Sequence, residues 1–139
     1  GKKGEGLLPI ISTMPKDNHS VMQLYLDGFK NNFFTIFYCK EKFSQKLNKN
    51  KLLKTFKYIG SQSLDNIIFK QKKATEKVFK LRNIPFRSFE VKNRNEKTLG
   101  ELFCYFILET ILLGRALNVN PFDQPSVELI KKETKKLFF

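Results

Sequence analysis

Apolar residues gather in three short runs that predict β-strands. Leu7–Ser12 is an apolar run that we expect to be a buried strand, with Pro9 favouring a sheet edge or the start of the strand. Phe33–Cys39 is rich in aromatic and β-branched residues and predicts a fully buried strand. In Pro85–Lys92, apolar and polar residues alternate, which indicates a third strand.

Two helices are expected between these strands. The first runs from about His19 to Asp27, with Asp17 or Asn18 as its cap, and ends at Gly28. The second covers residues 64–79, where apolar side chains recur at helical spacing opposite a charged face. Residues 40–57 are dense in lysine and are expected to be partly helical and partly loop.

Two further helices are expected near the end of the chain. Thr98-x-x-Glu101 is a capping-box pattern, and it precedes a long apolar stretch that predicts a largely buried helix to about Leu117. Asn120-Pro121 then breaks the chain.

The last helix opens at Gln124 or Ser126 and ends near Phe138. The predicted order is therefore β-α-β-α-β-α-α. Alternation of this kind predicts an α/β domain over residues 1–139, with a parallel sheet, helices on both faces and a helical C-terminal segment.

The charge of the chain narrows the choice of partners. The chain has 139 residues, of which 26 are Lys or Arg and 13 are Asp or Glu, so the formal net charge is +13. Such a balance favours an anionic partner: nucleic acid, an acidic membrane surface or a phosphorylated small molecule. A lysine-rich coding bias would raise the charge without any functional meaning, and the lysine run at residues 46–54 is expected to be a solvated face.

Cysteine, histidine and apolar content exclude several classes of site. Cys39 and Cys104 form no CxxC or framework spacing, which predicts reduced thiols in an intracellular protein. His19 is the only histidine, so this chain cannot hold a multi-histidine metal site. No apolar run approaches the ~20 residues of a membrane span, and no signal peptide opens the chain. The sequence starts at Gly1 rather than Met, which indicates a piece of a longer protein.

Lys131 is a candidate for acid–base chemistry. At about 100° per residue, Val127, Ile130 and Phe138 form an apolar stripe on the last helix, and Lys131 lies beside it. Partial desolvation of a lysine there favours its neutral form and suits proton transfer. The plainer interpretation is a lysine with a buried stem and a solvated head.

His19 is a second candidate. It lies at the predicted start of a helix after a strand, and ligand sites of open α/β sheets lie at that edge. The positive end of a helix dipole would favour a neutral, proton-accepting imidazole. A capping or surface histidine is the alternative.

The stretch from Gly114 to Lys131 resembles the C-terminal signature of the glucose-6-phosphate isomerase family. That signature has a small residue, two apolar positions, a four-residue gap and then Phe/Tyr-Asp-Gln-x-Gly/Ala-Val-Glu-x-x-Lys. Six positions of the second half match: Phe122, Asp123, Gln124, Val127, Glu128 and Lys131. The family usually has Gly or Ala where this chain has Ser126.

Three other segments resemble the same family in order and spacing. Asp17-Asn18-His19-Ser20 with Gln23-Leu24 and Gly28 is similar to its Gln-His-Ser/Ala-x-x-Gln-Leu-x-x-x-Gly segment, with Asn18 in place of the usual Gln or Lys. Residues 98–102 are similar to its Thr-Leu-Gly-x-Leu helix start. Gly1-Lys2 matches the end of its Glu-Ser-x-Gly-Lys motif, whose catalytic glutamate would precede residue 1.

The resemblance implies a SIS-type, three-layer α/β fold and a cytoplasmic enzyme of glycolysis and gluconeogenesis. The enzyme would interconvert glucose 6-phosphate and fructose 6-phosphate through a cis-enediol, without a cofactor or metal. His19 and Lys131 would be the acid–base pair for ring opening and closing, and Gln124 would face the sugar phosphate. The family's histidine reaches the site from the partner subunit, which implies a homodimer with shared sites.

The same resemblance implies that residues 1–139 alone are inactive, because the glutamate base and the phosphate loop of the family lie outside them. Neither nucleic acid nor a membrane is an expected partner of such an enzyme. Two alternatives remain: a non-catalytic SIS module that binds a phosphosugar, and a basic nucleic-acid-binding domain. The latter predicts surface lysines with exposed aromatic residues between them.

Overall fold

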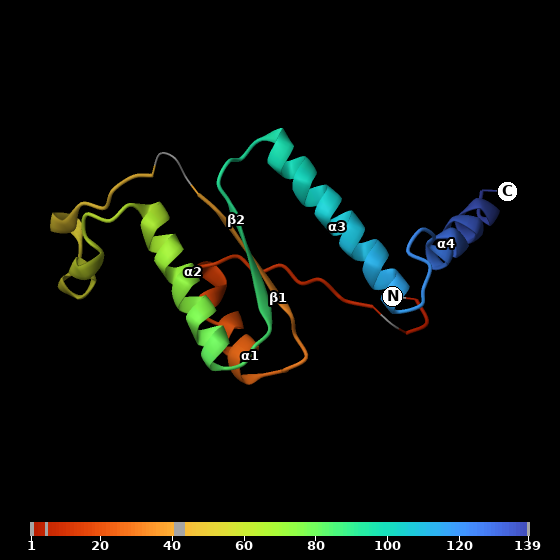
Figure 1. Ribbon diagram of the computed structural model, residues 1–139, viewed down its shortest axis with the longest axis horizontal. Coiled ribbons are helices and arrows are strands. Elements are labelled where there is room, and N and C mark those ends of the chain that lie inside the picture. Colours follow the sequence, from red (N-terminus) through yellow and green to blue (C-terminus); the bar gives the residue numbers. More distant parts are fainter. Residues whose placement is uncertain (1, 5, 41–43, 139) are drawn as a thin grey trace. The chain divides into compact units, whose positions relative to one another are not determined.

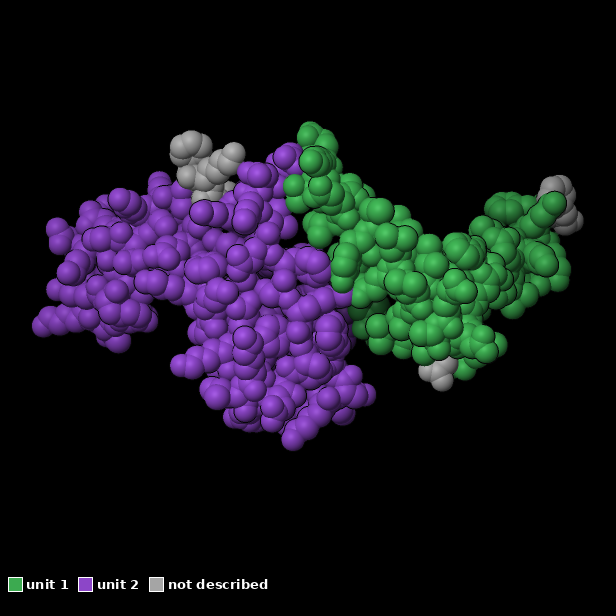
Figure 2. Space-filling view, in the orientation of Figure 1, with its two compact units in different colours: residues 1–9, 96–139 green, residues 10–95 purple. Residues whose placement is uncertain are grey.

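The computed structural model describes residues 2–4, 6–40 and 44–138. The chain forms two compact units, which are coloured separately in Figure 2. Unit 1 consists of Gly1–Pro9 and Glu96–Phe139, and unit 2 consists of Ile10–Asn95. Residues 41–43, which belong to the stretch predicted as helix or loop, lie outside the described residues.

Unit 2 contains a two-stranded parallel sheet (Figure 1). Strand β1 (Phe34–Cys39) pairs with β2 (Phe86–Val91), with Phe34 opposite Phe86 at one end and Cys39 opposite Val91 at the other. Helix α2 (Leu64–Leu81) connects the strands, and the short helix α1 (Val21–Asp27) precedes β1. The described part of the unit also contains three 3₁₀-helices: Lys16–Asn18, Lys49–Lys51 and Lys54–Ile59. The parallel α/β architecture predicted from the sequence is confirmed.

Aromatic side chains hold α1 and α2 on one face of the sheet. Phe79 of α2 is only 2% exposed, and its ring lies 4.8 Å from that of Phe34 and 5.8 Å from that of Phe86. Phe34 also meets Tyr25 of α1 edge to face at 5.0 Å. On the opposite face Phe37 stays 51% exposed. The prediction of a fully buried strand is therefore wrong for that face, whereas the aromatic contacts with α1 and α2 lie on the other.

Local chemistry sets both ends of α2. Ser63 caps the N-terminus and accepts a hydrogen bond from the backbone N–H of Asn66 at 3.2 Å. At the other end Asn83 takes a left-handed conformation with φ of 54°, and the Ile84 N–H donates to the Phe79 carbonyl at 2.9 Å. This is a Schellman ending, and asparagine tolerates its left-handed position better than most residues.

Unit 1 contains helices α3 (Glu96–Ala116) and α4 (Pro125–Lys136). The predicted capping box is wrong, because α3 begins at Glu96 and Thr98 lies inside its first turn. The expected burial of α3 is also wrong, since Phe103 is 61% and Leu112 is 65% exposed. An apolar helix is buried only where other elements cover it, and periodicity does not say whether they do.

The predicted strand at Leu7–Ser12 is the largest departure from expectation. These residues belong to no strand, and Leu8 and Ile11 are 85% and 92% exposed. A strand exists only with a hydrogen-bonded neighbour, and none of the described residues forms a ladder with this segment. The two cysteines, Cys39 and Cys104, are free thiols. Within the described parts of the chain, no helix has the length and apolar content needed to cross a membrane.

Candidate functional site

The loop that leads to Gln124 begins at a tightly defined helix end. Asn118 follows α3 with φ of 56°, and its N–H donates to the Arg115 carbonyl at 3.1 Å. The N–H of Val119 donates to the Gly114 carbonyl at 2.9 Å. Together these bonds form a second Schellman ending, which sets the direction in which the chain leaves α3.

Close packing fixes the middle of this loop. Pro121 lies against Gly114, where an added Cβ would stand 2.9 Å from the proline Cβ. The side-chain oxygen of Asn120 accepts a hydrogen bond from the Phe122 N–H at 3.0 Å. A larger residue at 114 would therefore displace the loop. This explains the small residue at the start of the signature.

The N-terminal residues of unit 1 are tied to the same loop. The Lys2 ammonium donates to the Asn120 carbonyl and forms an ion pair with the Asp123 carboxylate. The Lys3 ammonium donates to the Asn118 carbonyl at 3.3 Å. Two of the segments that carry the family resemblance, one ending at Lys2 and the other containing Asp123, thus lie side by side.

Helix α4 carries both predicted site residues of unit 1. Gln124 is its N-cap residue, and its carbonyl accepts from the N–H groups of Val127 and Glu128 at 3.0 and 3.1 Å. Lys131 lies seven residues further on, about two turns along the same helix face. The predicted start of this helix at Gln124 is confirmed.

The environment of Lys131 differs from the expectation. Its side chain is 66% exposed, and its ammonium lies 2.6 Å from the carboxylate of Glu128. The predicted desolvation is wrong, because the apolar stripe beside it is itself open: Ile130 is 67% and Phe138 is 80% exposed. A solvated, paired ammonium can donate a proton or bind an anionic oxygen, and the role of Lys131 stays a prediction.

His19 is exposed and belongs to unit 2. It follows the 3₁₀-helix Lys16–Asn18 and precedes α1, which begins two residues later at Val21. Its N–H donates to the Lys16 carbonyl at 3.5 Å, so it terminates one helix rather than opening the next. Gln124 and Lys131 thus lie on one helix of unit 1, whereas His19 lies in unit 2.

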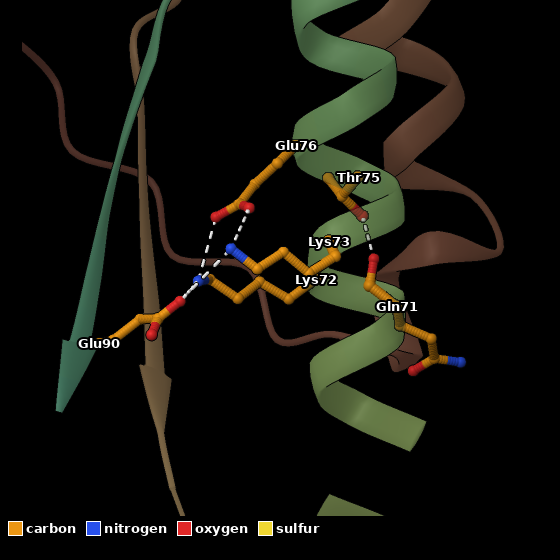
Figure 3. A network of polar contacts seen from close by, with 6 residues as sticks. All are labelled: Gln71, Lys72, Lys73, Thr75, Glu76 and Glu90. Carbon is orange, nitrogen blue, oxygen red and sulfur yellow. Dashed lines mark hydrogen bonds and ion pairs between the residues drawn. The ribbon is translucent and has the colours of Figure 1, made fainter. Parts of the chain in front are cut away.

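A polar network lies between α2 and β2 in unit 2 (Figure 3). The Lys72 ammonium, whose side chain is 5% exposed, lies 2.5 Å from Glu90 and 3.1 Å from Glu76. Lys73 approaches the same two carboxylates at 3.6 and 3.4 Å. The network therefore joins the helix to the strand across the core.

Burial and pairing act in opposite directions on these groups. Burial by itself lowers the pKa of Lys72, but the hydrogen bonds and charges of Glu90 and Glu76 outweigh it, so the pKa is raised. Burial by itself raises the pKa of Glu76, but hydrogen bonds from Ser88 and Lys72 outweigh it and lower the pKa. The pKa of Glu90 is lowered, chiefly by its hydrogen bond from Lys72. All three groups therefore stay charged near neutral pH.

Sequence reasoning did not find this network, although a signal was present. Lys72 lies between Ile68 and Phe79 on the apolar stripe of α2, and Glu76 follows it by one helical turn. A lysine within an apolar stripe, with a carboxylate four residues later, indicates a buried ion pair. Its partner Glu90 could not be identified without the strand register.

A cavity of about 500 Å³ opens where the two strands end. It lies at the carboxyl ends of β1 and β2, the edge at which parallel α/β sheets bind ligands. Among the described residues of unit 2, His19 is not part of its lining. Its lining includes both acids and bases: Tyr38, Lys40, Asp65, Asn66, Phe69, Glu90, Val91 and Lys92. No cluster of three or more His, Cys, Asp or Glu that could hold a metal occurs among the described residues.

Comparison with known proteins supports the resemblance found in the sequence. No model of a known protein family matches the chain. The chain is 36% identical over 140 residues to the glucose-6-phosphate isomerase of Mycoplasmopsis pulmonis, covering 99% of this chain and 33% of that protein. It is 33% identical over 137 residues to a probable glucose-6-phosphate isomerase of Methanococcus maripaludis, covering 95% of this chain and 30% of that protein.

The chain therefore spans about a third of the length of the curated relatives that it matches. A crystal structure of a hypothetical protein from Thermus thermophilus has the same fold over 90% of this chain and 30% of its own, with a TM-score of 0.78 and 23% identity. The resemblance to glucose-6-phosphate isomerases is confirmed over nearly the whole chain.

Proposed function

We propose that this chain forms one part of a glucose-6-phosphate isomerase, a cytoplasmic enzyme that interconverts glucose 6-phosphate and fructose 6-phosphate. The similarity to curated isomerases over 95–99% of the chain carries this proposal. The tie between Lys2 and Asp123 supports it, because it places the end of one family motif against the loop of another. The reaction needs no cofactor.

Three residues of this chain would serve the reaction. Opening the sugar ring requires a proton on the ring oxygen and removal of one from the hydroxyl at C1, and His19 and Lys131 are proposed as this acid–base pair. Gln124, on the helix that also carries Lys131, would hydrogen-bond the sugar phosphate. Their exposed positions leave both Lys131 and His19 open to a substrate.

A base must then carry a proton between C1 and C2 through a cis-enediol. The family resemblance gives this task to a glutamate that would precede residue 1. The contacts of Lys2 with Asn120 and Asp123 would bring such a residue close to Gln124. His19 would act in the site of the partner subunit of a homodimer, so that each active site needs two chains.

A chimeric enzyme tests this function. The matching third of the Mycoplasmopsis pulmonis enzyme is replaced by this chain, and formation of fructose 6-phosphate is measured. We expect an active chimera. Loss of a general acid or base typically costs ~10²–10⁴-fold in rate, so His19→Ala and Lys131→Ala should each lower kcat by at least ~100-fold.

Two controls accompany the chimera. Lys132→Ala removes a neighbouring lysine of α4 and should leave kcat unchanged, whereas Gln124→Ala should raise KM. The 139-residue chain alone should show no activity. A well-folded chimera without activity, or one that is insensitive to both substitutions at His19 and Lys131, would refute the proposal.

A further inference from the structure

Residues 45–62 of unit 2 form a small lobe that projects from the N-terminal end of α2 (Figure 1). The Leu47 N–H donates to the Gln62 carbonyl at 3.0 Å, and the Ser61 N–H donates to the Leu47 carbonyl at 3.1 Å. An antiparallel bridge between Lys46 and Ser63 closes the base. We call this segment, residues 45–62, the lysine lobe.

The lysine lobe carries charge of one sign only. Between Ser44 and Leu64 there is no Asp or Glu. Its five lysines are all exposed, and within the described parts of the chain none of their ammonium groups forms an ion pair: Lys46, Lys49, Lys51, Lys54 and Lys57. The lysines of α2 provide the contrast, since Lys72 and Lys73 both have carboxylate partners. The positive charge of the lobe is thus available to a partner.

Aromatic side chains are exposed between these lysines. Leu52 and Ile59 are partly buried, whereas Phe56 is 47% and Tyr58 is 79% exposed. Residues three apart lie one above the other in a 3₁₀-helix, so Lys54 and Lys57 share one edge of Lys54–Ile59. Ammonium groups in a row beside an open aromatic ring are the features by which proteins hold unpaired bases on a phosphate backbone.

We propose that the lysine lobe binds single-stranded nucleic acid, with its lysines on the phosphates and Tyr58 stacked on a base. A duplex would leave Tyr58 without a base face to stack on, because its bases already stack on each other. An anionic membrane would favour a longer amphipathic helix with one apolar face, whereas this lobe has two short 3₁₀-helices of mixed character. The lobe meets the criterion of lysines interleaved with exposed aromatic residues.

Fluorescence anisotropy with a labelled 12-nucleotide oligo(dT) tests the proposal on the 139-residue chain. Five neutralised phosphates would make affinity fall roughly 100-fold between 50 and 200 mM salt, from a slope of about −0.7 per phosphate. Lys54→Gln with Lys57→Gln removes two phosphate contacts. On the same slope, extrapolated from 1 M salt, this loss should weaken binding roughly 25-fold at 100 mM salt. Tyr58→Ala should weaken it about tenfold, and Tyr58→Phe should retain binding, because only the ring is needed for stacking.

The matched control is Lys77→Gln with Lys80→Gln, which removes the same charge from exposed positions on α2. This variant should lose less than threefold in affinity. Equal losses in the two double variants would show attraction by net charge alone and would overturn the proposal. So would tighter binding to a duplex of the same length, or to phosphatidylserine vesicles with no binding to oligo(dT). Circular dichroism confirms that each variant is folded.

Discussion

Replacing Lys72 by methionine should destabilise unit 2, because it leaves the Glu76 carboxylate in the core without its nearer ammonium partner. The side chains of Lys72 and Glu76 are only 5% and 12% exposed and lie 3.1 Å apart. Methionine keeps the apolar stem but removes the charge. Breaking a buried ion pair typically costs ~3–5 kcal/mol, and because Glu76 keeps Lys73 and Ser88 as partners, we expect a loss of about 2 kcal/mol.

Two further variants separate the ion pair from simple packing. Replacing both partners, as Lys72→Met with Glu76→Leu, removes the stranded charge and should bring stability back to within about 1 kcal/mol of the original. Lys73→Met removes a half-exposed lysine at 3.4 Å from the same carboxylate, and surface pairs of this kind contribute at most ~1 kcal/mol. The loss in unfolding free energy should therefore be largest for Lys72→Met and smaller for both Lys73→Met and the double variant.

The loss of folding stability caused by Lys72→Met should become smaller at acidic pH. The pKa of Glu76 in the folded chain lies below its ordinary value of 4.5, so the stability that it contributes is present above that value and is lost as pH falls through the folded pKa. Lys72 is one cause of that lowered pKa. The difference between the original chain and Lys72→Met should therefore be full at pH 7 and shrink below pH 4.5.

Hydrogen exchange of the β2 amides at pH 7, followed by mass spectrometry, measures opening free energies within unit 2. Urea unfolding across the acid range supplies the pH dependence. Unchanged protection in Lys72→Met, or a loss no larger than that of Lys73→Met, would refute the buried-pair reasoning. A double variant less stable than Lys72→Met would refute it equally.

The remaining predictions concern the proposed isomerase chimera. His19→Ala and Lys131→Ala should lower kcat far more on the cyclic sugar than on an open-chain analogue, because that analogue skips ring opening; equal losses in steady-state assays of both substrates would assign these residues to binding or structure. Mixing the His19→Ala chimera with one that lacks the glutamate base should restore part of the activity, since one site of each heterodimer keeps both groups. Mixtures that stay inactive despite heterodimers detected by native mass spectrometry would show that His19 serves its own subunit.

Elements that are determined by residues close together in the sequence were predictable. Strand β2 follows its alternation of apolar and polar residues. Helix α4 begins at Pro125, directly after its N-cap Gln124, because proline suits the first turn of a helix. Leu7–Ser12 has an equally clear apolar pattern, but a strand also needs a hydrogen-bonded partner, which the pattern does not supply. Thr98 shows the same limit, because a capping motif can be present inside a helix that starts earlier.

The candidate site was predictable only in part. The start of α4 after Gln124 was predicted correctly. The helical-wheel argument, however, placed Lys131 beside a packed apolar stripe that is open in the structure. The tie between Lys2 and Asp123 joins residues 121 positions apart, and no local pattern indicates such a contact. The Lys72 network was missed for the same reason, since Glu90 lies on a different element.

The tie between Lys2 and Asp123 also has a consequence for the order of events during synthesis. The bonds that shape residues 114–124 are local, so this loop can form as soon as α3 and its flanking residues have left the ribosome. The contact of Lys2 with Asp123 must wait until Asp123 itself has been made. By then residues 10–95, which lie between the two parts of unit 1, are complete. Unit 2 can thus fold first, and unit 1 closes last, when its two separate segments meet.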